Sequence, residues 1–498
     1  MTAKTNLEEY TKYSILIIIL FSIIVFTLAS IYHVSGDGCW HIPLGKFIAN
    51  NHRIPLFEPL GRDEPFWSPP VYHMIVAAVY SISNSDFAVK FISPFFGILT
   101  LTFSFLIIKK LFNPKLAFYS TLFLAFVPIF LDYSILSYVD ITLTFLVVLS
   151  VYFLINNRIA LSGITAGLSI LTKYNGAFVL PVLIFILYKR FGNKKEFYKK
   201  ALIVIALSLL IAAPWLIRNW ILLQNPIWPF LNFIFNGYPA KSYSGIDFGT
   251  LADQNLYAFT YLGFFGVPDG NYKALSLIDM PYFGFLFIIW LIGTFIFILP
   301  LITGILSIKN IGKKFKNYAP FMVWIVSYLI LFLAYVLNVG LSVSRMLLPA
   351  VPAFALFWAF GYYKLTKLNS KKIFFLLIIF AIFGFVFVEF AKIKLAANSW
   401  NFYEEDFGWV RKNTAQDSIF IANGQCVPYN IQRTSVYLST ENLEKADYIW
   451  VNQNFKLDRR SIFEKQNLDL LQSKNYNVAY RNQKTGTIIY EKPTLKTI

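Results

Sequence analysis

The stretch SILIIILFSIIVFTLASI, residues 14–31, contains no charged residue and is nearly long enough to cross a membrane. About 20 apolar residues span the hydrocarbon core as an α-helix. Runs of this kind recur along the 498-residue chain, of which 57% is hydrophobic and only 14% is charged. A soluble domain carries about 25% charged residues, and a transmembrane β-barrel shows weak alternating segments of about 10 residues. The sequence therefore predicts an all-α polytopic membrane protein. We expect the first run to be retained as a helix, because it is too long for a signal peptide and lacks a clean cleavage site.

The net charge of +18 is concentrated in a few short segments between apolar runs. In a soluble protein such a charge would favour nucleic acid as a partner. Here the positive-inside rule gives a simpler interpretation, with these segments in the cytoplasm and no role for nucleic acid. Together they hold 20 Lys and Arg and three Glu, a surplus of 17. The cations are Lys4, Lys12, Lys109, Lys110, Lys115, Arg158, Lys189, Arg190, Lys194, Lys195, Lys199, Lys200, Lys309, Lys313, Lys314, Lys316, Lys364, Lys367, Lys371 and Lys372.

This orientation predicts eleven spans, with the N-terminus inside and the C-terminus outside. The spans lie near 13–33, 88–109, 115–132, 139–156, 159–172, 175–188, 201–219, 282–308, 319–340, 344–363 and 373–395. Segment 68–83 must then begin and end outside, and at 16 residues it is short for a span, so we expect a helix at the membrane surface. Two outer loops, 34–87 and 220–281, complete a transmembrane domain over residues 1–396.

Hydropathy falls after residue 396, which predicts a small extracytoplasmic α/β domain over 397–498. The stretches SIFIANG, TSVYLST and DYIWVNQ are typical of strands, residues 461–474 of an amphipathic helix, and residues 476–492 of a hairpin that turns at 484–486. The two cysteines, Cys39 and Cys426, fall on the same predicted side. They could form a bridge, but we favour two unrelated thiols.

Ionisable residues near the outer ends of spans are the candidate functional groups, because charge within a membrane is costly and usually functional. The candidates are Asp37, Asp140, Lys173, Arg218 and Arg345. Each also has a structural interpretation: Asp37 as a turn residue, Asp140 as a helix cap, and the three cations as residues that reach the lipid headgroups. His41, Asp63 and Glu64 share the first outer loop and are possible substrate contacts, although His41 is more simply a packing residue. Asp132 is expected to be an ordinary loop acid.

The order of these motifs resembles the GT-C superfamily of membrane glycosyltransferases. The similarity is strongest to the branch of protein O-mannosyltransferases and aminoarabinose transferases. An acid follows the first span, Pro-Pro precedes the surface helix, and a second acid opens a span after one that contains proline. The matching stretches are Asp37, Pro69-Pro70, Pro128 with Asp140, GLSILTK (167–173), PWLIRN (214–219), NPIWP (225–229) and RMLLPAVP (345–352). Glycine follows Asp37, where family members often have a second acid.

The resemblance implies transfer of a sugar, mannose or similar, from a polyprenyl- or dolichyl-phosphate carrier to an acceptor hydroxyl at the outer membrane face. It implies that Asp37 is the catalytic acid–base residue and that Asp140 assists. A lipid phosphate is a good leaving group that needs positive charge, which Lys173, Arg345 and Arg218 would supply. We expect no required cofactor, although the two aspartates could hold Mg²⁺ or Mn²⁺. The expected partners are the lipid-linked donor, membrane lipids and a protein, lipid or glycan acceptor. The alternatives are a polytopic lipid or solute transporter and a membrane scaffold.

Overall fold

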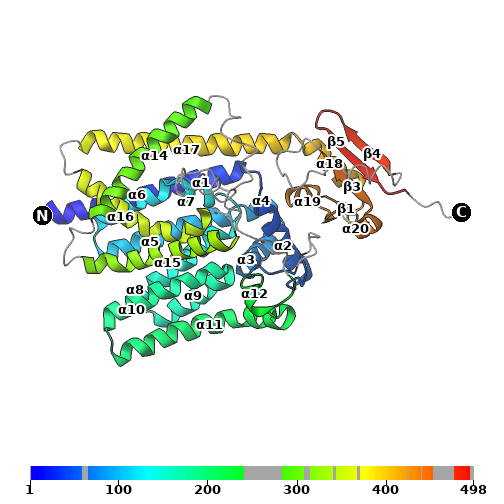
Figure 1. The fold of residues 1–498 in the computed structure, drawn as a ribbon. Helices are drawn as coiled ribbons and strands as arrows, with labels where there is room; N and C mark the ends of the chain where they lie inside the picture. The colour runs from blue at the N-terminus through cyan, green and yellow to red at the C-terminus, as the bar shows by residue number, and fades with distance from the viewer. Residues whose placement is uncertain are drawn as a thin grey trace.

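The computed structural model describes residues 2–58, 65–239, 283–307, 315–339, 344–366, 371–422, 424–438, 440–452 and 476–493. In these ranges the chain forms a bundle of long helices, and a small sheet follows at one end (Figure 1). The N-terminus lies at the opposite end of the bundle from the sheet. The predicted fold class, a helical membrane protein with a small C-terminal α/β unit, is confirmed.

The helical elements are α1 (Thr2–Ile31), α2 (Gly38–Asn51), α3 (Val71–Ser83), α4 (Asp86–Val89), α5 (Ile92–Leu111), α6 (Pro114–Phe126), α7 (Pro128–Tyr133), α8 (Val139–Ile155), α9 (Ile159–Thr172), η1 (Tyr174–Val179), α10 (Leu180–Phe191), α11 (Lys195–Leu223), α12 (Asn232–Phe235), α14 (Phe283–Leu306), α15 (Phe315–Val339), η6 (Ser344–Ala350), α16 (Val351–Leu365), α17 (Lys371–Asn401), α18 (Glu404–Asn413), α19 (Cys426–Ile431) and α20 (Thr440–Lys445). Within the described ranges, seven helical stretches are long and apolar enough to cross a membrane by length and composition. Each of the eleven predicted spans contains a helix, and the crossing of the shorter ones stays a prediction.

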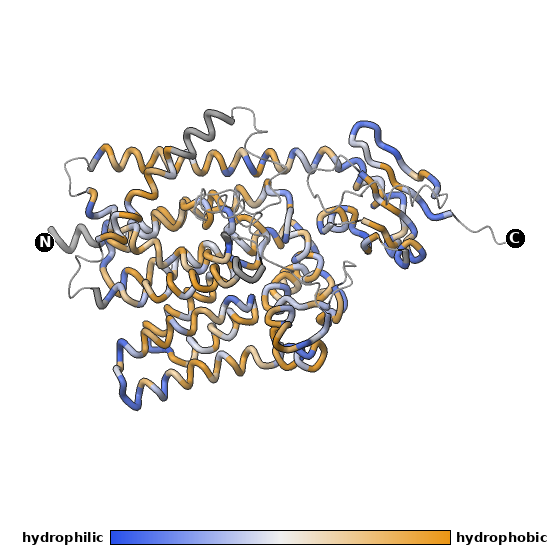
Figure 2. The backbone as a smooth tube through the Cα atoms, viewed as in Figure 1, coloured by the Kyte–Doolittle hydropathy of each residue, from blue (hydrophilic) through white to orange (hydrophobic). Residues whose placement is uncertain are grey.

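Several of the predicted spans are not one continuous α-helix. Val127 is extended between α6 and α7 because Pro128 follows it, and proline disfavours the helical conformation in the residue before it. The predicted span 175–188 begins as the 3₁₀ helix η1 and becomes α-helical only at Leu180. Long apolar stretches run along the bundle, and more hydrophilic residues gather around the C-terminal sheet (Figure 2).

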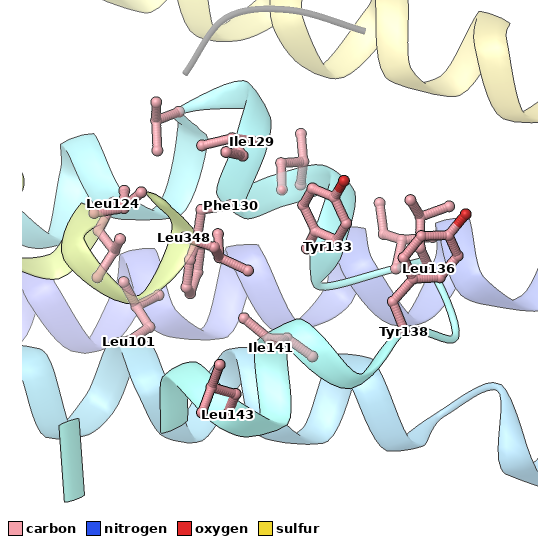
Figure 3. Packing of buried hydrophobic residues seen from close by; sticks show 14 of the residues in the cluster. Leu101, Leu124, Ile129, Phe130, Tyr133, Leu136, Tyr138, Ile141, Leu143 and Leu348 are labelled. Carbon is pink, nitrogen blue, oxygen red and sulfur yellow. The ribbon is translucent and has the colours of Figure 1, made fainter. Parts of the chain in front are cut away.

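Close helix packing holds the bundle together. α14 and α16 approach so closely that a Cβ at Gly304 would lie 1.9 Å from the Phe357 carbonyl oxygen, and one at Gly361 would lie 1.8 Å from that of Pro300. Small residues at such crossings let two helix backbones meet in a membrane. Between the helices lies a continuous apolar core, in which Phe130 of α7 packs near Leu348 of η6 (Figure 3). This core encloses the segment from α7 to α8 that carries Asp140.

A buried ion triad joins α7 to α17. The Lys392 ammonium lies 2.5 Å from Asp132 Oδ1 and 2.7 Å from Glu389 Oε2. The three side chains are only 5%, 1% and 6% exposed, respectively. The expectation that Asp132 is an ordinary loop acid is therefore wrong: it is a helical residue whose carboxylate is buried beside a lysine 260 positions later in the chain.

The first long loop is largely helical where it is described. α2 was not predicted, and it packs against α3, the 13-residue helix that lies within the predicted surface segment 68–83. Arrangement of α3 at the membrane surface stays a prediction. Residues 59–64 of this loop, including Asp63 and Glu64, and residues 240–282 of the second loop lie outside the described ranges.

The C-terminal region forms a five-stranded sheet in the order β2-β1-β3-β5-β4. Its strands are β1 (Ile419–Ile421), β2 (Thr434–Val436), β3 (Tyr448–Val451), β4 (Asn477–Asn482) and β5 (Thr487–Glu491). The first three pair in parallel, and β5 pairs antiparallel with both β3 and β4, so the predicted strands and hairpin are confirmed. The predicted helix 461–474 lies outside the described residues. α17 continues past the predicted domain boundary at residue 396 to Asn401.

A disulfide between Cys39 and Cys426 fastens α2 to α19. The favoured expectation of two unrelated thiols is therefore wrong. Two neighbouring contacts strengthen the junction: His33 hydrogen-bonds the Asn430 side chain over 3.1 Å and stacks on Trp400. The C-terminal unit is thus attached directly to the loop that follows the first helix.

Candidate active site

The turn between α1 and α2 presents Asp37. Gly36 takes a positive φ of 54°, a conformation that glycine adopts without strain, and the Asp37 carbonyl then accepts hydrogen bonds from the amides of Trp40 and His41. Asp37 thus stands at the start of α2, yet its carboxylate makes no capping hydrogen bond with that helix. The side chain is left to interact with residues outside its own helix.

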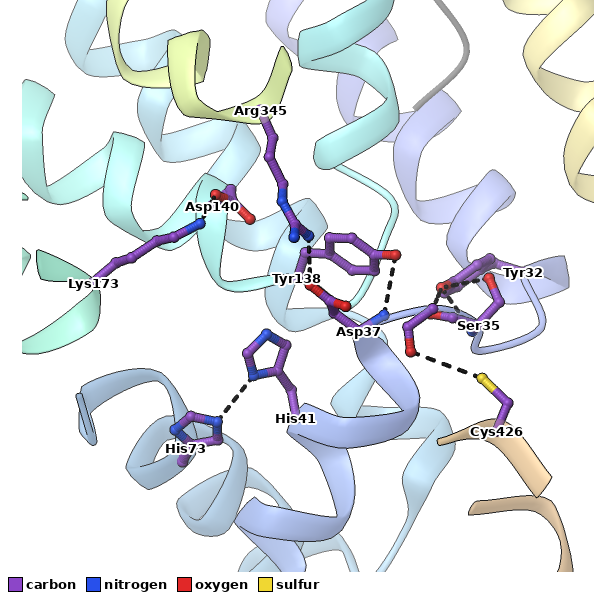
Figure 4. Close-up of polar contacts among 11 residues, drawn as sticks. Tyr32, Ser35, Asp37, His41, His73, Tyr138, Asp140, Lys173, Arg345 and Cys426 are labelled. Atoms are coloured by element: carbon purple, nitrogen blue, oxygen red, sulfur yellow. Dashed lines mark hydrogen bonds and ion pairs between the residues drawn. The ribbon is translucent and has the colours of Figure 1, made fainter. Parts of the chain in front are cut away.

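Arg345 is the partner of Asp37. Its Nη1 lies 2.5 Å from Asp37 Oδ2, and the two side chains are 19% and 30% exposed, respectively. Tyr138 supports both residues: its hydroxyl accepts a 3.1 Å hydrogen bond from the Asp37 amide, and its ring centroid lies 5.3 Å from the guanidinium carbon (Figure 4). Three distant segments therefore meet at one carboxylate.

A second acid–cation pair lies beside the first. Asp140 occupies the first turn of α8, and Lys173 follows the last residue of α9 in an extended conformation. Their Nζ–Oδ1 distance is 2.7 Å, with Asp140 only 2% and Lys173 21% exposed. The other carboxylate oxygen, Oδ2, is buried and has no hydrogen-bond partner in the described part of the chain. Asp140 Oδ2 can therefore accept a hydrogen bond from a polar group that enters the site.

The ionisation of Asp37 follows from its neighbours. Burial by itself raises the pKa of this carboxyl, but the Arg345 guanidinium, helped by His41 and Lys173, holds that pKa well below its usual range. Asp37 is consequently ionised at neutral pH and able to accept a proton.

His41 lies one turn after Asp37 and faces the same region (Figure 4). Its Nδ1 is 2.9 Å from Nε2 of His73 on α3, so the two rings share one proton across this contact. Trp40 packs edge-on against both rings. The pair fixes the orientation of the His41 ring, whose other nitrogen is on the side of the two aspartates.

Arg218 has a different position. Its guanidinium donates hydrogen bonds to the carbonyls of Pro55 (3.0 Å) and Phe66 (3.2 Å) and lies over the ring of Trp215. These contacts connect α11 to the first loop. The structure thus brings together Asp37, Asp140, Lys173, Arg345 and His41, and it places Arg218 against Pro55 and Phe66 of the first loop instead.

Tyr138 is the site residue that sequence reasoning missed. A tyrosine in an apolar segment carries no charge pattern, and its only signal is its place two residues before Asp140. As for metals, the described residues contain no group of three or more His, Cys, Asp or Glu side chains that could hold an ion. Both site carboxylates are instead bound by protein cations.

Comparison with known proteins identifies similar sequences and folds. Residues 67–218 match the family of dolichyl-phosphate-mannose-protein mannosyltransferases. No curated protein matches the sequence. Among solved structures, ArnT from Cupriavidus metallidurans bound to undecaprenyl phosphate is similar with a TM-score of 0.64 and 11% identity, covering 97% of this chain and 99% of that one. The oligosaccharyltransferase of Archaeoglobus fulgidus, tethered with an acceptor peptide, is similar with a TM-score of 0.56 and 14% identity, covering 97% and 74%.

The family match covers less than half of the chain, and the structural likeness extends over nearly all of it. Helices of this length and apolarity, together with the membrane enzymes they resemble, identify an integral multi-pass membrane protein. The resemblance indicated by the order of the sequence motifs is thereby confirmed: this chain has the fold of the GT-C glycosyltransferases.

Proposed function

We propose that this protein is a glycosyltransferase that moves a sugar from a polyprenyl- or dolichyl-phosphate carrier to an acceptor hydroxyl. The observation that carries the proposal is the pair of adjacent acid–cation contacts, Asp37 with Arg345 and Asp140 with Lys173. A transfer of this kind needs a carboxylate for the acceptor proton and cations for the departing phosphate. The relatives bound to undecaprenyl phosphate and to an acceptor peptide support both halves of the reaction.

In the proposed reaction, the acceptor oxygen forms a bond to the anomeric carbon of the sugar. The bond between that carbon and the phosphate oxygen breaks, and the phosphate leaves with the electron pair. Asp37 takes the proton from the acceptor, a contribution of roughly 10²–10⁴-fold. A single displacement of this type inverts the anomeric configuration.

Arg345 has two possible anionic partners in this scheme. Before the donor binds, its Nη1 is engaged by Asp37. A donor phosphate competes for the same guanidinium, which favours bidentate contact with phosphate. As the Arg345 guanidinium turns towards the phosphate, it moves away from Asp37. The pKa of the Asp37 carboxyl then rises, which makes Asp37 a stronger base. Donor binding would therefore activate the base for the acceptor.

Asp140 and Lys173 complete the site. Lys173 is the more exposed of the two and can reach a phosphate as a point charge. Asp140 keeps Lys173 in place and offers its unpaired Oδ2 to the acceptor hydroxyl. Because protein cations neutralise both carboxylates, we propose that the reaction proceeds without a divalent metal.

We also propose that the site faces outwards in a cell membrane, with the C-terminal unit on the same side. The Cys39–Cys426 disulfide supports this orientation, because such bonds persist outside the cytoplasm and are rare within it. The disulfide joins the Asp37 loop to the C-terminal unit, so both must occupy one compartment. The cationic segments of the sequence support the same orientation, since they lie at the helix ends that are opposite to the site and are expected in the cytoplasm.

The decisive experiment compares Asp37→Asn with Asp86→Asn. Asp86 is a partly exposed acid on α4 that pairs with Lys46 rather than with a cation of the site. Purified protein is incubated with a panel of radiolabelled polyprenyl-phosphate sugars, and transfer to acceptor is measured. We expect Asp37→Asn to lose at least about 10²-fold in rate with donor binding retained, and Asp86→Asn to keep activity. Full activity of Asp37→Asn, retention of the anomeric configuration, or transport of substrate across vesicles without chemistry would refute the proposal.

A further inference from the structure

A cavity of about 520 Å³ lies between the ends of α5, α8, α10 and α15. Leu111 is the last residue of α5, and Ile155 is the last residue of α8. Asp140 is in the first turn of α8 and Val151 of the same helix lines the cavity, so 11 residues of helix, or about 16 Å, separate the candidate active site from this cavity. Ligand sites are typically about 300–1,000 Å³ in volume, so the cavity is large enough to hold part of a small molecule.

The floor and the rim of the cavity differ in chemistry. The floor is apolar and includes Val151, Val182, Phe321 and Trp324, each no more than 3% exposed. The rim is exposed and polar, formed by Lys189, Arg190 and Asn317. No acidic residue is among the residues that line the cavity in the described part of the chain. Such a site suits a molecule with an apolar body and an anionic end.

The two cations have different roles at the rim. Arg190 donates hydrogen bonds to the carbonyls of Leu154 (3.3 Å) and Ile155 (3.4 Å), and it also contacts the Asn157 side chain. It therefore caps the end of α8 and holds its positive charge in a fixed place. Lys189, one residue earlier, makes no hydrogen bond or ion pair within the described ranges, and it is exposed and therefore accessible to an external anion.

We propose that this cavity binds the phosphate headgroup of an anionic phospholipid, with Lys189 as the main contact and the start of an acyl chain over the apolar floor. Lys189 and Arg190 belong to the clusters that the charge pattern assigns to the cytoplasm. Basic pockets between transmembrane helices on that side bind the headgroups of anionic lipids, which are enriched in the cytoplasmic leaflet. The site is separate from the proposed reaction and stands whatever sugar is transferred.

The test measures lipid binding to the full-length protein in neutral detergent by native mass spectrometry. Phosphatidylglycerol is the probe, and phosphatidylcholine of the same chain length is the reference lipid. We expect selective retention of phosphatidylglycerol, and a loss of roughly five-fold in its affinity on Lys189→Gln, the effect of one cation near a headgroup. Lys194→Gln is the matched control: it removes an exposed lysine from the connection that follows α10, which does not line the cavity, and it should leave the affinity unchanged.

A second variant separates a lipid seated in the cavity from one attracted to surface charge. Ile186 lines the cavity beside both cations, and Ile186→Trp would fill the space and keep their charge. We expect this variant to lose selective phosphatidylglycerol binding. Wild-type affinity in Ile186→Trp, equal effects of Lys189→Gln and Lys194→Gln, equal retention of the two lipids, or displacement of phosphatidylglycerol by equimolar inorganic phosphate would each overturn the proposal.

Discussion

Replacement of Lys392 by methionine tests the buried triad most directly. The substitution keeps the length and apolar contacts of the side chain and removes only the ammonium group. It leaves Asp132 and Glu389 side by side, only 1% and 6% exposed, without the cation that both contact. Because the triad joins α7 to α17, we expect the whole bundle to be destabilised.

The magnitude follows from the geometry. An ion pair at about 4 Å gains roughly 4 kcal/mol at the effective dielectric constant of about 20 that suits protein sites. Lys392 makes two closer pairs, but the desolvation of all three groups offsets much of this gain. Removal of one partner from a buried pair costs about 3–5 kcal/mol, since the remaining charge stays in an apolar environment. We expect a loss of that size for Lys392→Met.

The assay is unfolding of purified protein in mixed micelles by increasing dodecyl sulfate, followed by tryptophan fluorescence. Lys394→Met is the matched control, because Lys394 lies two residues later on α17 and is exposed. Its loss should cost less than about 1 kcal/mol. The variant that combines Asp132→Leu, Glu389→Met and Lys392→Met should recover most of the stability, because an apolar replacement of a whole buried network is often neutral. Equal stability of Lys392→Met and Lys394→Met, or no recovery in the triple variant, would refute the reasoning.

Four further outcomes are expected. In Arg345→Gln, the acid limb of the rate profile should move to higher pH, because the guanidinium holds the pKa of Asp37 down; an unmoved limb would argue against their coupling. Lys173→Gln should raise KM for the lipid donor more than it lowers kcat, as steady-state kinetics would reveal. Reduction of the Cys39–Cys426 bond, or Cys426→Ser, should expose the C-terminal unit to limited proteolysis, with a stability loss of about 2–5 kcal/mol. Treatment with a chelator should leave sugar transfer unchanged, and restoration of a lost activity by Mg²⁺ or Mn²⁺ would contradict the metal-free proposal.

The sequence predicted the helices well because hydropathy reports burial in lipid directly. The breaks within them were harder. The extended residue before Pro128 follows from a local rule, but the 3₁₀ start of the segment at Tyr174 depends on the packing around Gly176, where an added Cβ would lie 2.3 Å from the Ser169 backbone. Tertiary packing determines this 3₁₀ start, and such packing cannot be inferred from a single sequence.

The acids of the candidate site could be predicted from the sequence, but the pairing of each acid with its cation could not. Charge in an apolar context singled out Asp37, Asp140, Lys173 and Arg345, but it could not say which cation meets which acid. Arg218 shows the limit of this reasoning. It has the same charge and the same predicted depth as the other cations, but it binds carbonyls of the first loop and neither aspartate.

Two long-range contacts lay beyond sequence reasoning. Glu389 and Lys392 stand three positions apart in an apolar helix, a spacing that signals a buried pair, but nothing near them points to Asp132. The disulfide joins cysteines 387 positions apart, and sequence spacing at that distance carries no information on geometry.

The long separation in sequence between Cys39 and Cys426 has a consequence for the biosynthesis of the protein. Cys39 belongs to the first helix of the loop that carries Asp37, whereas Cys426 is synthesised only after the last long helix, α17. The loop cannot be locked until almost the whole chain has left the ribosome and its C-terminal unit has reached the same side of the membrane. Formation of the disulfide therefore requires that insertion has placed both cysteines on the same side of the membrane. A chain arrested midway would keep Cys39 as a free thiol, and a chain with its C-terminal unit on the other side would keep both thiols free.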